Sequence, residues 1–395
     1  MIIGLEQYKS KWNIHTDSAI RPGLETITAA LEELGNPHRS GRFIHLAGTN
    51  GKGSTAAFLS ATLQAHGCSV GNFYSPCIED LHDQIQINGE PVSPEELGLV
   101  MERLSRLETP MSDFELLTAA AFVVFQERAP DFIIIEAGMG GTLDSTNVIS
   151  SEIAIIPSIS IDHTHFLGTT IEEIAQHKAG IIKKWKPVVI GELPEEAMNI
   201  VQETADRLHA EVIQPNGLEN ASLKLKGQHQ QQNASLAMEA AKELLGLDFC
   251  EEKARQGLET AELSYRFERV YPGVIFDGAH NKASIDALVA TINETFPERP
   301  IHIVMGIFKD KDYISALRQL ETVSDHFTFI DFDNERALPA QILFEESRSK
   351  RKTIMNLHDI LPVSGKGEET IVTGSLHLLV LLRNSAKSFF QHYQG

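Results

Sequence analysis

The sequence contains few cysteines and no excess of positive charge, and both absences narrow the classes of protein it can encode. Only three of its 395 residues are cysteines, namely Cys68, Cys77 and Cys250. An odd number without metal-ligand or redox spacing argues against a disulfide framework and fits a reducing cytosol. The formal net charge is −20 at pH 7, the opposite of the basic surface that nucleic acids require. We therefore expect a protein that does not bind nucleic acid.

Long apolar runs are also absent. No stretch reaches the roughly 20 residues that a membrane-spanning helix needs. The first residues, MIIGLEQYKSKW, lack the basic flank, apolar centre and cleavage site of a signal peptide. The sequence therefore predicts a cytoplasmic protein with no membrane partner.

The pattern of apolar and amphipathic segments predicts an α/β protein. At 395 residues the chain is long enough for two or three domains. Strands are predicted at 43–47, 70–74, 132–135, 153–161, 188–190, 274–276, 301–305, 327–332 and 371–372, and helices at 54–66, 114–128, 171–182, 195–209, 234–245, 283–295, 313–320 and 376–383. Alternation of this kind is typical of parallel sheets. A second series of alternating strands and helices begins near Tyr265. We therefore place a domain boundary at about Leu263, which divides the chain into domains 1–262 and 263–395.

The segment FIHLAGTNGKGS, at 43–54, predicts a phosphate-binding loop. A short apolar strand leads into a glycine-rich turn, and a helix follows; the turn contains Gly48, Gly51, Lys52, Gly53 and Ser54. Glycines let backbone N–H groups approach an anion, the helix dipole favours negative charge, and the lysine ammonium reaches the terminal phosphates. The usual GxxxxGK[ST] order is not met, because Gly53 separates Lys52 from Ser54. A glycine-rich turn alone is often only a turn, but the strand, lysine and helix together indicate nucleotide binding.

Two further polar residues stand where predicted strands end. Glu136 follows one strand and opens the loop GMGG, while His163 follows Asp162 after another. Ligands of open α/β sheets lie at the carboxyl ends of strands, so an acid such as Glu136 can hold a metal ion against phosphates. The alternatives are a solvated loop acid and a surface histidine, and His165 competes with His163. Magnesium prefers oxygen ligands, so chemistry alone does not assign His163 to a metal.

Several other motifs extend across nearly the whole chain. They are YSPCI from Tyr74, FELLTAAAF from Phe114, EAGMGGTLDSTNVI from Glu136, DHTHFLGTTIEEIAQHKAGIIK from Asp162, LKGQHQQQNASLAM from Leu225, DGAHN from Asp277, KDKD from Lys309 and TGSLH from Thr373. Together with HLAGTNGKGS, and in this order, they resemble the folylpolyglutamate synthase/dihydrofolate synthase family, a branch of the Mur ligases. The resemblance implies a large P-loop ATPase domain with a mainly parallel sheet, a smaller Rossmann-like α/β carboxyl-terminal domain, and an active site between them.

The resemblance also implies roles for individual residues. The residues expected to bind ATP are Gly51, Lys52, Gly53, Ser54, Asn233, Arg266 and Asp277. Two magnesium ions are expected, with Ser75, Glu136 and His163 as ligands and Glu136 bridging both. Contacts to the acid substrate are expected from Phe114, Glu115, Leu143, Asp144 and Ser145.

Two more residues are expected to act in the chemistry. The lysine that matches Lys178 is carboxylated by CO₂ in Mur-type ligases, becoming an anion that supports the second magnesium ion, although not every member is modified. His280 is placed near the phosphates, where it could stabilise charge. Without the resemblance, Lys178 would be a solvated helix lysine, His280 a histidine at a helix start, and Asn233 the N-cap of the following helix.

The sequence departs from the family pattern at several positions. Cys77 replaces a usual histidine, Gln84 and Thr142 replace usual arginines, and Lys282 replaces a proline. The residues expected to bind ATP and metal are retained, whereas several of the changes fall near the expected acid substrate. The identity of that acid is therefore less constrained than the reaction type.

These observations predict an ATP-dependent ligase that adds L-glutamate to a folate carboxylate through an acyl phosphate, as a folylpolyglutamate synthase and possible dihydrofolate synthase. The expected partners are folate or dihydropteroate, L-glutamate and ATP, and a monomer is expected. The alternatives are a related ligase for a non-folate acid, a P-loop kinase, and a nucleotide-binding module without catalysis.

Overall fold

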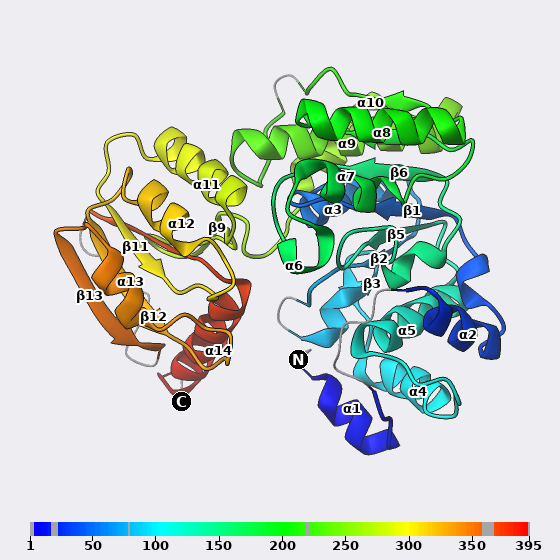
Figure 1. Ribbon diagram of the computed structural model, residues 1–395, viewed down its shortest axis with the longest axis horizontal. Helices are drawn as coiled ribbons and strands as arrows, with labels where there is room; N and C mark the ends of the chain where they lie inside the picture. The colour runs from blue at the N-terminus through cyan, green and yellow to red at the C-terminus, as the bar shows by residue number, and fades with distance from the viewer. Residues whose placement is uncertain (1–3, 17–22, 78–79, 219–220, 358–366, 394–395) are drawn as a thin grey trace. The chain divides into compact units, whose positions relative to one another are not determined.

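The computed structural model describes residues 4–16, 23–77, 80–218, 221–357 and 367–393 (Figure 1). The chain divides into two compact units. Unit 1 comprises Met1–Lys224 and Gln230–Glu262, and unit 2 comprises Leu225–His229 and Leu263–Gly395. The chain thus enters unit 2 briefly before returning to complete unit 1. Among the described residues, no helix is both long and apolar enough to cross a membrane.

Unit 1 is built on an eight-stranded sheet in the order β4-β3-β2-β5-β1-β6-β7-β8. Its strands are β1 Phe43–Leu46, β2 Val70–Phe73, β3 Ile85–Ile87, β4 Glu90–Pro91, β5 Phe132–Glu136, β6 Ile153–Ile156, β7 Val188–Ile190 and β8 Val212–Ile213. Neighbouring strands pair in parallel along the series β2-β5-β1-β6-β7-β8. Strands β3 and β4 extend the sheet beyond β2 by antiparallel pairing. Residues at the carboxyl ends of β1 and β5 are in register, Leu46 opposite Glu136.

Several helices of unit 1 bury apolar residues against this sheet. The helices of this unit are α1 Leu5–Trp12, α2 Glu25–Glu33, α3 Lys52–Ala65, α4 Pro94–Leu104, α5 Asp113–Arg128, α6 Thr164–Leu167, α7 Ile171–Ala179, α8 Glu195–Leu208, α9 Gln228–Leu245 and α10 Glu251–Thr260. One core joins β1, β2 and β5 to α1, α2, α4 and α5, and another joins β6 and β7 to α7 and α8. Reciprocal side-chain and backbone hydrogen bonds cap α5 at Ser112 and α7 at Thr170.

Unit 2 has a six-stranded sheet in the order β13-β12-β11-β14-β10-β9. Its strands are β9 Glu268–Tyr271, β10 Val274–Phe276, β11 Ile301–Met305, β12 His326–Asp331, β13 Arg351–Asn356 and β14 Glu369–Thr373, and its helices are α11 Lys282–Thr295, α12 Tyr313–Leu320, α13 Ala340–Glu346 and α14 Leu376–Tyr393. Only β9 runs antiparallel to its neighbour among these described strands. The predicted α/β class with two mainly parallel sheets is confirmed.

Most predicted elements have somewhat different limits in the structure, and two of these differences bear on the site. The strand predicted at 153–161 ends at Ile156, because Pro157 has no N–H to donate to a sheet and the residues beyond it bond to the phosphate loop instead. The helix predicted at 234–245 begins earlier, at Gln228. Asn233 therefore lies inside α9, and the alternative that it caps this helix is wrong.

Candidate functional site

The loop between β1 and α3 is held in place by the segment that follows β6. Thr49 N–H donates to Ser158 O at 2.9 Å, and Asn50 N–H donates to the Ser158 hydroxyl at 3.0 Å. The Thr49 hydroxyl donates to Ser160 O at 3.0 Å. The helix begins at Lys52, so the amino end of α3 opens directly onto this loop. Sequence reasoning did not identify Ser158, whose role depends on a contact between segments more than 100 residues apart.

Gly51 occupies a position that no other residue fits without rearrangement. Its φ is 87°, and a Cβ at this position would lie 2.5 Å from Asn233 Oδ1 and 3.0 Å from Pro157 Cβ. L-residues with a left-handed backbone cost roughly 1–2 kcal/mol, and the close contacts add to that cost. The glycine thus lets the loop pass close to Asn233.

Gly51→Ala is expected to weaken ATP binding at least tenfold, because the added methyl group displaces the loop or the Asn233 side chain. Calorimetric titration with a non-hydrolysable ATP analogue measures this change. Gly67→Ala is the matched control, since Gly67 also has a positive φ, 88°, but nothing lies within 4 Å of its Cβ position. Equal affinity losses in the two variants would contradict a specific role for the contact at Gly51.

Lys52 and Glu136 face one another at the carboxyl edge of the sheet. Lys52 Nζ donates to Gly48 O at 3.0 Å and lies 3.7 Å from Glu136 Oε1. Glu136 ends β5 and is only 4% exposed. The alternative that Glu136 is a solvated loop acid is therefore wrong. Burial, with a contribution from the Glu136 charge, raises the pKa of the neighbouring Tyr74, so this phenol stays neutral.

Lys178 is buried near the carboxyl end of α7, with 3% of its surface exposed. Burial lowers its pKa to about 7, and the positive charge of Lys52 acts in the same direction. Asp162 and Asp144 oppose the shift but are outweighed. The alternative of a solvated helix lysine is wrong, and a neutral amine is accessible at physiological pH.

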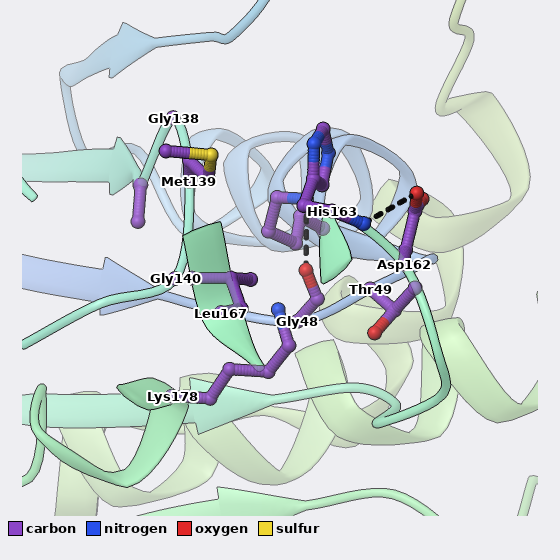
Figure 2. Close-up of a pocket in the computed structure, with 11 residues that line it drawn as sticks. Gly48, Thr49, Gly138, Met139, Gly140, Asp162, His163, Leu167 and Lys178 are labelled. Atoms are coloured by element: carbon purple, nitrogen blue, oxygen red, sulfur yellow. Dashed lines mark hydrogen bonds between the residues drawn. The ribbon is translucent and has the colours of Figure 1, made fainter. Parts of the chain in front are cut away.

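Lys52 and Lys178 line one pocket, drawn in Figure 2, whereas Glu136 is not among its lining residues. Four segments supply its walls: the phosphate loop, the residues after β5, the segment around α6, and α7. The lining residues are Gly48, Thr49, Lys52, Ala137, Gly138, Met139, Gly140, Asp162, His163, Leu167 and Lys178. Figure 2 shows Lys178 extending from its helix into the pocket. The pocket therefore combines a phosphate-binding loop with two lysines, an aspartate and a histidine.

His163 lies at the entrance to α6 and is exposed. Its backbone N–H donates to Asp162 Oδ1 at 2.8 Å (Figure 2). His163 lines the pocket, whereas the competing His165 is not among the lining residues. Ser75 follows β2, the neighbour of β5 in the sheet, and is partly buried. Ser75 thus lies just after the end of a strand, whereas His163 lies beyond the end of β6, at the start of α6. Of these two predicted ligands, His163 lines the pocket and Ser75 does not.

The residues expected to contact the acid substrate have two different environments. Glu115 is buried and accepts hydrogen bonds from Ser112 N–H and hydroxyl, both at 2.8 Å. Asp144 is buried and accepts from Met139 N–H at 2.7 Å, and burial raises its pKa. Both carboxylates therefore hold backbone segments beside the pocket.

Their neighbours differ in exposure. Ser145 is buried, with its hydroxyl 3.4 Å from that of Thr118. Phe114 is partly buried and packs over Gly138, where a Cβ would come within 2.6 Å of its ring. Leu143 is 45% exposed. Phe114 and Leu143 are thus the members of this set whose surfaces remain available to a ligand.

In unit 2, Arg266 precedes β9 and Asp277 follows β10, and the two side chains are close enough for their charges to interact. Asp277 accepts hydrogen bonds from Phe267 N–H and Ala279 N–H, both at 2.9 Å. Burial raises the pKa of Asp277, and the nearby charge of Arg266 opposes this shift. His280 precedes α11, and its Nδ1 lies 2.8 Å from Gly278 O. The helix is capped by Asn281, so His280 does not cap it.

The whole chain is similar to known ligases. Residues 46–214 match the model of the Mur ligase middle domain, and residues 265–365 match that of the Mur ligase glutamate ligase domain. The dihydrofolate synthase/folylpolyglutamate synthase of Bacillus subtilis is 35% identical over 93% of this chain and 96% of its own length. The chain belongs to the folylpolyglutamate synthase/dihydrofolate synthase family.

Solved structures of this family superpose on the protein. The folylpolyglutamate synthase of Mycobacterium tuberculosis, in complex with ADP and AMPPCP, is 30% identical, covers 98% of both chains and gives a TM-score of 0.86. A bifunctional folylpolyglutamate synthase/dihydrofolate synthase from Yersinia pestis was solved in complex with AMPPNP and a manganese ion. It is 26% identical, the superposition covers 97% of this chain and 98% of that chain, and the TM-score is 0.86. The fold of this family member is thus shared along its length.

The family member departs from the usual pattern at residues that have internal partners here. Gln84 is buried and donates to Tyr74 O at 3.0 Å. The Thr142 hydroxyl donates to His177 O at 3.0 Å, next to Lys178 on α7. Cys77 is partly buried and not in a disulfide. Gln84 and Thr142 thus stabilise the backbone near the pocket.

Proposed function

We propose that the protein is an ATP-dependent ligase that joins the amine of L-glutamate to a folate carboxylate. The observation that carries this proposal is the convergence of Lys52, Lys178 and the Asp162–His163 pair on one pocket beside the phosphate loop. A pocket with this composition suits phosphoryl transfer, in which positioning and charge neutralisation supply most of the catalysis. The family relationship supports glutamate and folate as the substrates.

ATP is proposed to place its terminal phosphates at the amino end of α3. The ammonium of Lys52 and the backbone N–H groups of Gly51, Gly53 and Ser54 would face them. Asn233, beside Gly51, is proposed to contact the adenine, and Arg266, Asp277 and His280 of unit 2 to contact the nucleotide. The relatives crystallised with ADP, AMPPCP and AMPPNP support this assignment.

The chemistry begins with attack of the folate carboxylate oxygen on the γ-phosphorus, which forms an acyl phosphate and releases ADP. The amine of glutamate then attacks the acyl carbon, inorganic phosphate leaves, and the amine loses a proton as the amide forms. The two steps are needed because a carboxylate does not accept an amine directly. Lys52 would neutralise the charge that develops on the transferred phosphoryl group.

Two magnesium ions are proposed at this site, with Ser75, Glu136 and His163 as ligands. The donor chemistry fits in part: Glu136 offers a nearly buried carboxylate at the end of β5, as a hard cation requires, whereas imidazole is an unusual magnesium ligand. Bound magnesium would offset the negative charge of the phosphates and of the leaving group. The manganese ion in the Yersinia pestis relative supports a divalent metal in this family.

Lys178 is proposed to carry a carboxyl group. A lysine must be neutral to react with CO₂, and its lowered pKa of about 7 leaves a large fraction of the amine neutral near pH 7. The product is an anion, which suits a position close to Lys52 and to the second metal. An unmodified, neutral Lys178 would be equally compatible with this burial. The variant Lys178→Ala, tested with and without acetate, distinguishes the carboxylated lysine from the unmodified one.

Glu136→Gln is expected to lower activity at least tenfold at limiting magnesium, because the amide keeps the shape of the side chain but removes its charge. Raising the magnesium concentration should restore part of the rate. Steady-state ATP turnover over a magnesium series measures both effects. Glu152→Gln is the control, since Glu152 pairs with Arg42 on the surface of the same unit. Unchanged activity of Glu136→Gln at limiting magnesium would contradict a role in metal binding.

A related ligase for a non-folate acid is the second candidate, and the changes at Cys77, Gln84 and Thr142 favour it. The direct test measures phosphate release with ATP, acid and glutamate, separately and together. A folate ligase requires all three. Release without glutamate indicates a hydrolase, whereas a kinase would form ADP and a phosphorylated acceptor without releasing inorganic phosphate. Release with glutamate but only with a non-folate acid supports the second candidate.

Location and assembly remain predictions. In the described part of the chain, Cys68, Cys77 and Cys250 form no disulfide, and the proposed location is the cytoplasm. We further propose that the protein acts as a monomer on small molecules, without nucleic acid or membrane partners. Size-exclusion chromatography with light scattering measures the oligomeric state.

A further inference from the structure

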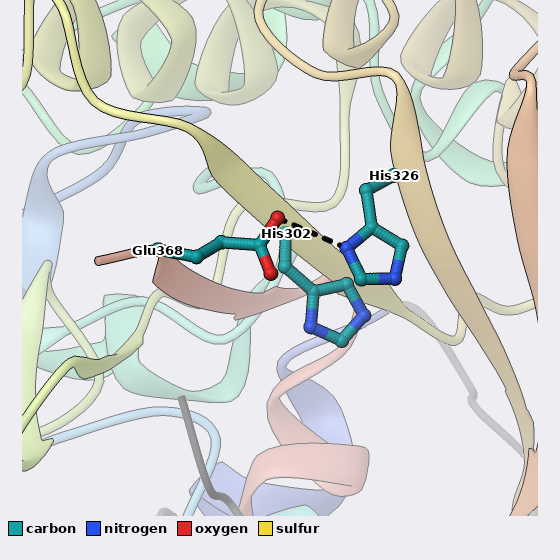
Figure 3. Close-up of side chains that lie close together, drawn as sticks. All are labelled: His302, His326 and Glu368. Carbon is teal, nitrogen blue, oxygen red and sulfur yellow. Dashed lines mark hydrogen bonds and ion pairs between the residues drawn. The ribbon is translucent and has the colours of Figure 1, made fainter. Parts of the chain in front are cut away.

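Unit 2 gathers two histidines and a glutamate at the amino ends of three neighbouring strands (Figure 3). His302 is the second residue of β11, His326 is the first of β12, and Glu368 directly precedes β14. These strands are adjacent and parallel, in the order β12-β11-β14. The three residues therefore come from separate strands but from the same edge of one sheet.

The strand register places all three side chains on one face. His302 is opposite His326 on one side and opposite Thr370 on the other. Because side chains alternate along a strand, Glu368, two residues before Thr370, shares the face of Thr370. Figure 3 shows the three side chains gathered together, and one donor atom from each lies within 4.8 Å of the others. His326 Nδ1 is 3.0 Å from Glu368 Oε1, and the two imidazole rings stack with centroids 4.0 Å apart.

The protonation states of this cluster suit a metal ion. Burial lowers the pKa of His302 to about 4, and neighbouring His326 adds to the shift, so His302 is a neutral imidazole at neutral pH. Burial raises the pKa of Glu368, but the hydrogen bond with His326 and nearby positive charge bring it below its usual value. The cluster thus offers a neutral imidazole and a carboxylate anion.

Hydroxyl groups fix the orientation of His302. Thr328 Oγ1 lies 2.8 Å from His302 Nε2, and Thr370 Oγ1 lies 3.5 Å from Nδ1. Hydrogen bonds of this kind commonly orient imidazole ligands around metals. The competing cation is Arg351, which lies 3.2 Å from Glu368 Oε1 and 3.3 Å from Asp325 Oδ1. Its side chain is 54% exposed, so it can leave Glu368 while keeping Asp325.

We propose that His302, His326 and Glu368 bind a zinc ion or a similar borderline divalent metal. Two imidazoles and one carboxylate form a ligand set that suits zinc, and a water molecule can complete a tetrahedron. Donors on a tetrahedral zinc ion lie roughly 3.3 Å apart, so zinc binding would require the two imidazole rings, now stacked with an interplanar angle of 16°, to rotate out of the stack and bring their donor atoms together. Magnesium, which prefers oxygen, is not favoured by this set.

The position of this site indicates a structural role. The cluster lies at the amino ends of β11, β12 and β14, whereas Asp277 follows the carboxyl end of the parallel strand β10. The metal would therefore lie at the amino ends of the parallel strands, whereas Asp277 lies at their carboxyl ends. The metal would join three strands, raise the thermal stability of the protein, and leave the rate of the ligase reaction unchanged.

The test uses the full-length, chelator-treated protein in saturating magnesium. Zinc is titrated by calorimetry, and cobalt is titrated while its visible absorption reports tetrahedral coordination. We expect one equivalent in the wild type, at least a hundredfold weaker binding in His302→Gln, His326→Gln and Glu368→Gln, and unchanged binding in His209→Gln. His209 is the control because it stacks on Trp185 in unit 1, outside the cluster.

Arg351→Gln supplies a variant that does not remove a ligand. The substitution removes the arginine cation that competes with a metal ion for Glu368. We therefore expect zinc to bind several-fold more tightly to this variant than to the wild type, and to raise its melting temperature by more. Unchanged far-ultraviolet circular dichroism would show that the ligand variants fold, and the Arg351→Gln result decides the matter if they do not. Absence of the zinc equivalent in both the wild type and Arg351→Gln, or its retention in a folded ligand variant, would overturn the proposal.

Discussion

Lys52→Ala is expected to reduce ATP turnover at least a hundredfold while leaving the melting temperature unchanged. The Lys52 ammonium lies between Gly48 O and Glu136, at the mouth of the phosphate loop. Removing a group that stabilises developing charge typically costs about 10²–10³ in rate. The side chain contributes little to either apolar core of unit 1, so stability should not change.

The measurement is steady-state phosphate release at saturating substrates, with thermal unfolding followed in parallel. Lys242→Ala is the control, because Lys242 is an exposed lysine that pairs only with Glu239 in the described part of the chain. Retention of more than about a tenth of the wild-type rate, equivalent to less than roughly 1.4 kcal/mol of barrier, would remove Lys52 from the catalytic machinery.

Lys178→Ala is expected to be nearly inactive and to regain part of its activity with acetate or formate. A carboxylated Lys178 is an anion, so a small carboxylic acid can occupy the space that the truncation leaves and restore the negative charge. An unmodified cationic lysine would not be replaced by an anion in this way. Phosphate release at increasing acetate concentration distinguishes these cases, and mass spectrometry of the intact protein under CO₂ looks for the added carboxyl group.

Lys184→Ala is the matched control, since Lys184 is close in sequence but exposed. It should retain full activity and show no response to acetate. If Lys178→Ala is active without acetate, the residue has no role in the reaction, despite its burial. If it is inactive and acetate has no effect, the carboxylated form is excluded and a neutral or cationic lysine is the remaining explanation.

The sequence predicted the central strands well because their apolar runs are short and end at residues that cannot continue a sheet. The strand at 188–190 and the helix at 313–320 have the predicted limits. The strand predicted at 153–161 was too long, because the apolar residues after Pro157 resemble a strand but bond to the phosphate loop. That contact depends on tertiary structure and leaves no local pattern.

Helix α9 shows why polar segments were harder to interpret. Its first residues, QHQQQN, have no apolar stripe, yet Gln230 and Asn233 are buried. Glutamine is a good helix former, but the apolar periodicity from which the helix was predicted begins only at 234. By contrast, the Ser112–Glu115 pair that caps α5 has a recognisable sequence pattern, which could have been used.

The candidate site was predicted partly from the residues and partly from the family. Strand ends and the glycine-rich loop indicated Lys52 and Glu136 directly, because the parallel sheet brings these ends together. Lys178 could not be distinguished from a surface lysine by its sequence, since its burial arises from packing in the folded chain. The supporting contacts of Thr142 with α7 were also not evident, because they join segments that are distant along the chain.

The central claim is that this pocket uses ATP to attach glutamate to a folate carboxylate. The most direct measurement incubates the protein with ATP, magnesium and L-glutamate, together with dihydropteroate or tetrahydrofolate, and analyses the products by mass spectrometry. We expect at least one of the two acids to gain the mass of one glutamyl residue, with one phosphate released for each product formed and no product when a non-hydrolysable ATP analogue is used. Phosphate release without any glutamylated product, or a phosphorylated acid as the final product, would contradict the account.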